Sequence, residues 1–382
     1  MTRAAWVPAI AACLASLACL DIAEPEPVGG SGGYIASGGT SASGGGASGA
    51  AGAAAAGGVA AGGGTGGSGG GAGGNGGAGG NGGGSGGVGC TKDCGGGACA
   101  NGKCQPFELA SDGSGPVAIA LDATHVYWAS YTTGVRRVPK AGGSVETIAS
   151  GDEAYAVAVD ADNVYWIRNS GTAADVMKAA KGGGSPVALA SNQNGASSGL
   201  AVAGGWVYYT TSQELRRIGT NGTNGTALAA NLSTPVYVAI APGSIPVWIE
   251  SPAPQQRVIA MLQLNQRVEL ATGQANPHRL AIDGSTVYWC NHYGGKVMQV
   301  SMGGGTPTAL STWSGNPMAL AVDATNVWFT NDNAGEIRVV PKSGGTTTLV
   351  VGGQGVPQAL AVDEGFLYWA NNSGGKIMKL AK

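Results

Sequence analysis

The sequence predicts an all-β fold: a seven-bladed β-propeller of four-stranded blades, preceded by a signal peptide, a disordered Gly-rich linker and a small Cys-rich segment. Three observations predict the propeller. A motif with the pattern P-x-x-L-A-V-D-x-x-x-V-Y-W recurs seven times, nearly every copy carries two adjacent aromatic residues, and the last copy ends one strand short of a complete blade.

The repeated motif runs through residues 105–382, the predicted propeller domain. Its period of about 40 residues, without a helical pattern, is typical of a four-stranded blade. Solenoid repeats of similar period are helical, whereas alternating Val-Tyr-Trp segments favour strands. The seven copies are Pro116–Trp128, Ala154–Trp166, Ser197–Tyr209, Pro235–Trp248, Pro277–Trp289, Pro317–Phe329 and Pro357–Trp369.

The strands can be assigned within one unit. We predict them at Ala319–Asp323, Asn326–Thr330, Glu336–Val340 and Thr346–Val351, with Asn and Gly in the turns between them. The fourth unit is less regular, because it contains four prolines, and a six-bladed ring is the alternative if that unit is degenerate. These prolines are Pro242, Pro246, Pro252 and Pro254.

The aromatic pairs favour radially packed sheets. Of the 14 positions in the seven pairs, 13 are aromatic, and only Val247 departs. Successive residues of a strand point to opposite faces of the sheet, so each pair places one large side chain on each face. A two-layer sandwich leaves one face of each sheet in water. Blades arranged around an axis instead bury both faces.

The two ends of the repeat region predict how the ring closes. The last unit ends at Lys382 after its third strand, and Phe107–Ser111 resembles the fourth strand of other units, such as Ala188–Ser191. We therefore expect Phe107–Ser111 to complete the last blade, which would leave no exposed edge there.

The N-terminus has the pattern of an export signal. Arg3 is followed by the apolar segment Ala4–Leu20, which is shorter than the roughly 20 residues of a transmembrane helix. Ala15–Cys19 resembles a bacterial lipobox, a resemblance that implies a signal peptide at 1–18 and lipidation of Cys19. Cys13 is a second candidate, and a plain secretory signal is the alternative.

A Gly-rich segment follows the signal, and we predict a disordered tether over residues 19–89. Val28–Gly89 holds 33 of the 72 glycines and no charged residue. Such a composition cannot bury enough apolar surface to offset the entropy of ordering. As a flexible coil its 62 residues would span roughly 40–47 Å.

Four cysteines cluster in residues 90–104: Cys90, Cys94, Cys99 and Cys104. In an exported chain they predict two disulfides, with three possible pairings. A zinc site is the alternative, although paired C-x2-C knuckles and a neighbouring His are missing. We interpret Cys290, which stands alone, as a buried residue of a strand.

The Val-Tyr-Trp-Ala-Asn segments resemble the YWTD-type and NHL-type propeller repeats. The whole order of lipobox, Gly-rich spacer, Cys segment and β domain is similar to that of bacterial surface lipoproteins. The resemblance implies the fold and an exported, lipid-anchored protein of the outer membrane or cell surface. It implies no particular function, because propellers host unrelated activities.

Composition excludes some partners. Charged residues are 11% of the chain and the net charge is −2, so there is no basic stripe to neutralise the phosphates of a nucleic acid. A polybasic membrane-surface protein is excluded for the same reason. We expect a monomer with no cofactor.

Motifs for chemistry are few. The chain has three His and no metal-binding pair at helical spacing. An Asp recurs at one position of the repeat, where it ends the first strand. A ring of carboxylates for a cation is one interpretation, but an Asx-turn that accepts the next backbone N–H groups is favoured. These residues are Asp122, Asp160, Asp283, Asp323 and Asp363.

The candidate ligand site comes from departures in the repeat. The third residue of a unit is Ala or Gly five times, but Tyr237 and Arg279 in the other two, and by alternation both would project into a central funnel. An Arg there could hold an anion or carboxylate. We add His278, Asn291 and His292 as neighbours in the strands and loops.

No catalytic residue or metal ligand is assigned. The sequence thus predicts a non-catalytic binding module of the cell surface with a protein or glycan ligand. A propeller enzyme of the lyase or lactonase type and a structural or matrix protein are the alternatives.

Overall fold

The computed structural model describes residues 90–382, except residues 112, 152, 170–172, 196–198, 252–256, 312 and 314. The predicted signal peptide, the lipidation site Cys19 and the Gly-rich tether lie outside the described residues. In the described ranges every regular element is a strand. None of these ranges forms a helix of the length and apolarity that a membrane span requires.

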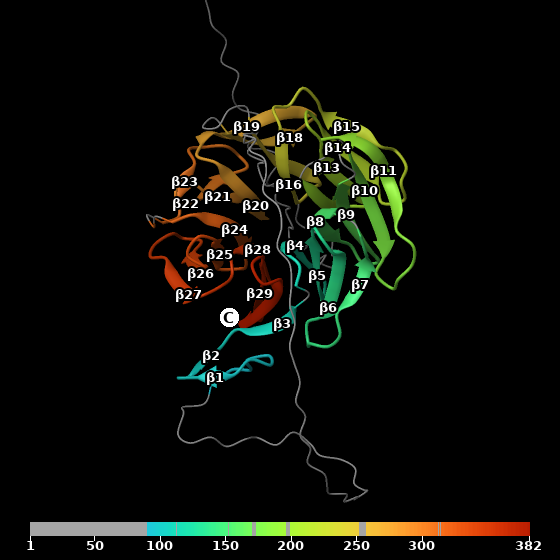
Figure 1. Cartoon of the computed structure of the whole chain (residues 1–382). Coiled ribbons are helices and arrows are strands. Elements are labelled where there is room, and N and C mark those ends of the chain that lie inside the picture. The colour runs from blue at the N-terminus through green and yellow to red at the C-terminus, as the bar shows by residue number, and fades with distance from the viewer. Residues whose placement is uncertain are drawn as a thin grey trace, which may run out of the picture.

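Seven four-stranded antiparallel sheets form a ring (Figure 1). We name the blades A to G in chain order and list their strands from the axis outward. Blade A is β4 (Pro116–Leu121), β5 (His125–Ser130), β6 (Gly134–Pro139) and β7 (Glu146–Ala149); blade B is β8 (Glu153–Val159), β9 (Asn163–Asn169), β10 (Ala173–Ala180) and β11 (Val187–Asn194). Blade C is β12 (Leu200–Ala203), β13 (Trp206–Thr210), β14 (Leu215–Gly219) and β15 (Thr226–Ala229); blade D is β16 (Pro235–Ala241), β17 (Ile245–Glu250), β18 (Arg257–Gln263) and β19 (Gln266–Gln274).

Blade E is β20 (Pro277–Asp283), β21 (Thr286–Asn291), β22 (Lys296–Ser301) and β23 (Thr308–Ala309); blade F is β24 (Pro317–Val322), β25 (Asn326–Asn331), β26 (Glu336–Pro341) and β27 (Thr348–Val351). Blade G is β28 (Pro357–Val362), β29 (Phe366–Asn371), β30 (Lys376–Ala381) and β3 (Phe107–Ser111). The innermost strands of neighbouring blades contact one another around the whole ring, including β28 against β4.

The blade count and the closure agree with the sequence. The proline-rich fourth unit forms the complete blade D, so the six-bladed alternative is wrong. β3 pairs with β30, with Phe107 opposite Lys379 and Ser111 opposite Lys376. The N-terminal strand therefore supplies the outermost strand of blade G and joins the two ends of the repeat.

The aromatic pairs fill the spaces between blades, as predicted. Tyr127 of β5 packs in a cluster with Trp166 of blade B, whereas its neighbour Trp128 packs in a second cluster with Tyr368 of blade G. Tyr127, Trp128 and Trp166 are fully buried. One pair thus joins its blade to both neighbours, because its two side chains lie on opposite faces of the sheet.

The recurring aspartates hold turns and also join blades. Asp122 Oδ1 accepts hydrogen bonds from the backbone N–H of Thr124 (2.8 Å) and His125 (2.7 Å), which is the predicted Asx-turn. Its other oxygen contacts Lys181 Nζ of blade B at 2.7 Å. Burial would raise the pKa of Asp122, but hydrogen bonds from Lys181, Tyr127 and the backbone lower it well below its usual range.

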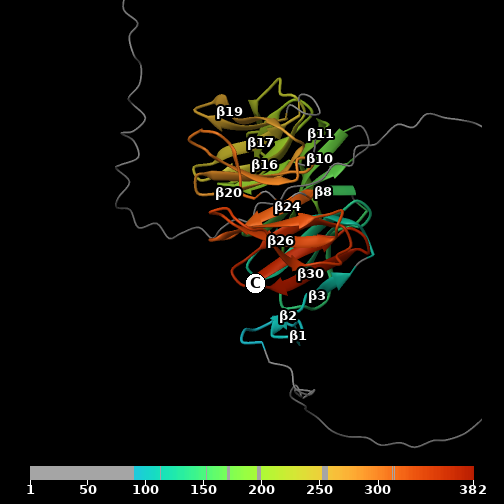
Figure 2. The ribbon, with the colours of Figure 1, turned by 90° about the vertical axis from the view of Figure 1, so that its left-hand side faces the viewer.

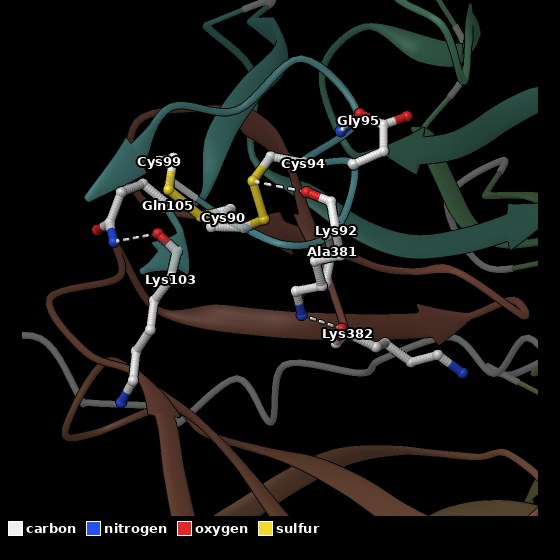
Figure 3. Close-up of a disulfide and its surroundings, with 11 residues drawn as sticks. Cys90, Lys92, Cys94, Gly95, Cys99, Lys103, Gln105, Ala381 and Lys382 are labelled. Carbon is white, nitrogen blue, oxygen red and sulfur yellow. Dashed lines mark hydrogen bonds between the residues drawn. A yellow bond between two sulfur atoms is a disulfide. The ribbon is translucent and has the colours of Figure 1, made fainter. Parts of the chain in front are cut away.

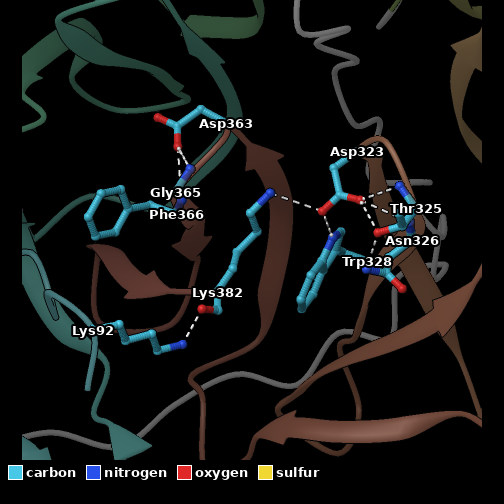
Figure 4. A network of polar contacts seen from close by, with 9 residues as sticks. All are labelled: Lys92, Asp323, Thr325, Asn326, Trp328, Asp363, Gly365, Phe366 and Lys382. Carbon is cyan, nitrogen blue, oxygen red and sulfur yellow. Dashed lines mark hydrogen bonds and ion pairs between the residues drawn. The ribbon is translucent and has the colours of Figure 1, made fainter. Parts of the chain in front are cut away.

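The same contact recurs at three other junctions, each between an Asp and the Lys that follows the third strand of the next blade. In Figure 4, Asp323 accepts from Lys382 Nζ at 3.0 Å and from Trp328 Nε1 at 2.7 Å. The remaining pairs are Lys140–Asp363 and Lys342–Asp283. Four of the five recurring aspartates therefore join neighbouring blades through a lysine.

The Cys-rich segment packs on blade G. Disulfides join Cys90 to Cys99 and Cys94 to Cys104 (Figure 3), one of the three pairings that the sequence left open. The segment contains the short strands β1 (Cys99–Ala100) and β2 (Lys103–Cys104), which lie next to β3 in both views (Figure 2). With all four thiols in disulfides, the zinc alternative does not apply to this structure.

Candidate functional site

Two residues at the axis have an unusual backbone. In six of the seven blades the innermost strand carries a β-bulge near the third residue of its unit, and in blades D and E that residue is Tyr237 and Arg279. Their φ angles are 45° and 51°, in the left-handed region that bulky residues rarely adopt. Such strain persists only where the surrounding structure imposes it, and it clusters at functional sites. The bulge re-aims both side chains, so strand alternation alone does not give their direction.

Arg279 crosses the axis of the ring. Its Nη2 donates to the backbone carbonyl of Val117 in β4 (2.8 Å) and to that of Gln358 in β28 (3.3 Å). These acceptors belong to blades A and G, three and two blades further along the ring. The side chain is buried, and burial lowers the pKa of its guanidinium. The Tyr237 ring centroid lies 5.4 Å from the guanidinium carbon.

A row of polar rings extends from Tyr237 to the surface. The Tyr237 hydroxyl lies 3.3 Å from Nδ1 of His278, and the His278 ring lies 5.3 Å from that of His292, centroid to centroid. The His292 ring in turn meets Tyr293 edge-on at 5.2 Å. Tyr293 is 79% exposed, so the row runs from the buried axis to solvent.

Two further charged residues face this row. Burial lowers the pKa of Arg257, at the start of β18, and Arg257 in turn helps to lower the pKa values of both histidines. Asp332 lies in the loop after β25, with Oδ1 3.9 Å from Nε2 of His292. We call Tyr237, Arg257, His278, Arg279 and His292 the axial cluster, and Asp332 is the carboxylate beside it.

The structure thus brings together four of the five residues that the sequence singled out. The fifth, Asn291, serves the interior instead: it accepts a hydrogen bond from Trp289 Nε1 (3.0 Å) and donates to Gln274 Oε1 (3.0 Å). Sequence reasoning missed Arg257, the first residue of β18, because Lys296 and Lys376 begin the third strand of other blades and make a charge at this position unremarkable. Aligning the repeats could have found Asp332, because it occupies the position of His292 in the next blade.

His278 predicts a pH dependence of stability. Burial, together with the charges of His292, Arg257 and Arg279, lowers the pKa of His278 to about 3. The native protein therefore keeps this imidazole neutral, whereas the unfolded chain protonates it near pH 6.5. The contribution of neutral His278 to the free energy of unfolding is fully present above about pH 6.5. It decreases as the pH falls below that value, by at most about 1.4 kcal/mol per pH unit.

We expect His278→Gln to reduce the dependence of stability on pH below about pH 6.5. The free energy of unfolding, measured by urea titration between pH 7 and pH 4, should fall less steeply in the variant. Carboxylates such as Asp122 and Asp323, whose pKa values are lowered, also destabilise the fold on acidification. They are common to both proteins, so the difference between the two profiles reports His278. Parallel profiles would contradict the prediction.

Comparisons with known proteins support the fold. No protein-family model matches the chain, and no curated protein is similar to it in sequence. Virginiamycin B lyase from Staphylococcus aureus has a TM-score of 0.60 at 15% identity, over 73% of this chain and 98% of the lyase. YCF48 bound to D1 peptide has a TM-score of 0.55 at 13% identity, over 73% and 96% of the two chains.

A computationally designed protein, Ika8, has a TM-score of 0.53 at 15% identity, over 72% of this chain and 98% of the designed one. At such identities the likeness shows the propeller fold alone.

Proposed function

We propose that the protein is a non-catalytic binding module of the cell surface, held on a lipid-anchored tether, and that its ligand site is the axial cluster. The observation that carries the proposal is the left-handed backbone of Tyr237 and Arg279, which places two long polar side chains at an axis where other blades have Ala or Gly. Folding must overcome the strain of both residues. We infer that these two positions are strained because they form a ligand site.

The arrangement of the two ends of the ring supports this proposal. The cluster lies where the innermost strands begin and the second strands end, since His292 follows β21 and donates its backbone N–H to Asn276 just before β20. The Cys-rich segment contacts the opposite end: Lys92 bonds Lys382, and Gly95 lies against Phe366 at the start of β29. A tether that joins the propeller through Cys90 would thus attach at one end of the ring and leave the axial cluster at the other end.

A binding screen tests the site. The mature chain would be applied to a glycan and peptide array beside the double variant His292→Gln/Tyr293→Ala. We expect the ligand signal to be lost in the double variant. Leu264→Ala is the matched control, because Leu264 is 92% exposed in the turn between β18 and β19, at the other end of the ring. Signals equal in all three proteins would place the ligand site elsewhere.

The lipid anchor is tested separately. We expect Cys19→Ser to move the protein from the membrane fraction to the soluble fraction, because the acyl chains that hold it would no longer be attached. Immunoblots of fractionated cells measure the change, with Cys13→Ser as the matched control. Release by Cys13→Ser, with Cys19→Ser still in the membrane, would assign the lipid to the other cysteine.

An enzyme is the second candidate function. The pair of His292 Nε2 and Asp332 Oδ1, 3.9 Å apart, is the observation that favours it, because a carboxylate beside an imidazole can orient a general base. The propeller of a lyase shares the fold, as does that of a peptide complex, so the fold alone does not decide. If this pair is catalytic, the parent protein should convert a bound compound and Asp332→Asn should abolish that turnover. If the site only binds, neither the parent protein nor the variant should show turnover.

A further inference from the structure

We propose that the axial cluster binds the carboxylate of a small organic acid whose carbon skeleton packs on Tyr293, as a uronic acid would. The inference rests on the proposed function and names the chemistry of its ligand. Several polar atoms of this cluster have no hydrogen-bond partner among the described residues, and they indicate the chemistry of the ligand.

Arg257 differs from most arginines of the ring. Five of them form an ion pair with a nearby carboxylate: Arg137, Arg168, Arg216, Arg267 and Arg338. Arg257 is half-buried, and within the described ranges its side chain has neither an ion pair nor a hydrogen bond. A cation that is partly removed from water without a counter-charge is unfavourable, so this guanidinium is available to an anion.

Further donors at the same place are unsatisfied. Nε of the buried Arg279 has no acceptor among the described residues, and neither ring nitrogen of His292 makes a hydrogen bond there. Buried polar atoms are nearly always paired in folded proteins, so three such atoms in one cluster point to a missing partner. Because most of these groups are donors, the partner must supply acceptors.

The charge balance selects an anion of one negative charge. With both imidazoles neutral, the two guanidinium groups of Arg257 and Arg279 contribute +2, and Asp332 contributes −1, which leaves +1. A guanidinium donates two parallel N–H bonds that match the two oxygens of a carboxylate. A monocarboxylate therefore balances the cluster, whereas a phosphate dianion would exceed its charge.

The rings of the cluster indicate what carries the carboxylate. Tyr293 is 79% exposed and stands beside His292, where it offers a ring face next to the charged groups. Large ring faces at a binding site pack against the apolar surface of a ligand, and the polar groups orient it. A flat or ring-shaped skeleton that bears one carboxylate satisfies both requirements.

Calorimetry on the mature chain tests this inference at pH 7. D-Glucuronate is the probe, D-glucose its neutral match, and inorganic phosphate the competing anion. We expect glucuronate to bind, and glucose to bind at least tenfold more weakly, because a charge-assisted pair contributes about 1.4 kcal/mol or more. Phosphate should also bind at least tenfold more weakly, because it has no carbon skeleton to pack on Tyr293 and its dianion exceeds the charge of the cluster. Thermal unfolding with each compound gives a second measurement, since a ligand that binds the native state raises Tm.

Two variants locate the site. Arg257→Gln should weaken glucuronate binding at least tenfold and remove the rise in Tm. Lys296→Gln is the matched control, because Lys296 is the first residue of β22, the position of Arg257 in the next blade, and is exposed. It should bind glucuronate as the parent protein does. Both variants should fold, which their melting curves without ligand verify.

Several results would contradict the proposal that the cluster binds a carboxylate. These are equal binding of glucose and glucuronate, tighter binding of phosphate, no binding of glucuronate at any concentration reached, or unchanged binding by Arg257→Gln. If the array nevertheless yields a ligand whose signal is lost in His292→Gln/Tyr293→Ala, the binding function stands and only the carboxylate is wrong. If the double variant keeps every array signal, the site itself is wrong.

Discussion

Deletion of the chain through Ser111 is expected to destabilise the whole propeller, although it removes a single strand of the ring. Without β3, the strand β30 becomes an edge with unpaired backbone groups that are open to other chains. The deletion also removes Leu109, which is buried, and Phe107, which is partly buried, from the core between blades A and G. At about 1.5–3 kcal/mol for each large apolar side chain, the loss is a large share of a typical stability of 5–15 kcal/mol.

Three truncations separate the contributions. Deletion through Gly89 removes only the predicted signal peptide and tether and should leave Tm unchanged. Deletion through Gln105 also removes the Cys-rich segment, which exposes Phe366 but keeps β3, and should cause a smaller loss. Deletion through Ser111 should lower Tm by roughly 10 °C or more and cause aggregation. Circular dichroism and light scattering on heating measure both effects. Equal melting of the last two proteins would show that β3 does not stabilise the ring.

Replacement of Trp289 by Ala is expected to cost about 3–5 kcal/mol of unfolding free energy, and more if the cavity does not collapse. Trp289 is fully buried between blades D and E, in a cluster with Val247 and Ile249. Its Nε1 donates to Asn291 Oδ1 at 3.0 Å and to Gln274 Oε1 at 3.2 Å. The substitution thus opens a cavity and also leaves buried acceptors without their donor.

Urea titration of the variant measures this loss. Trp289→Phe should cost less, because it keeps an aromatic ring in the cluster and loses only the hydrogen bonds and part of the volume. Tyr293→Ala is the control at the surface, where a substitution usually changes stability by less than about 0.5 kcal/mol. A cost for Trp289→Ala as small as that of Tyr293→Ala would mean that the aromatic pair does not hold neighbouring blades together.

The sequence by itself determined the architecture, because the signals for it are local. Adjacent aromatic residues such as Tyr127 and Trp128 alternate between the two faces of a strand whatever the partner is. The segment Phe107–Ser111 resembles the fourth strands of other units, and this likeness indicated its place in blade G. The strands fell within one or two residues of their observed bounds in blade F, where Pro317–Val322 was predicted as Ala319–Asp323. Tyr237 and Arg279 were also visible, as departures from a repeated Ala or Gly.

Only the tertiary structure decided how residues of different blades meet. Lys181 and Asp122 are far apart in the chain, and their contact depends on the packing of blade B against blade A. The pairing of the four cysteines depends on how their segment folds onto blade G. The bulge at Arg279 turns its side chain across the axis to blades A and G. Such contacts arise from the spacing and twist of neighbouring sheets, which no single repeat encodes.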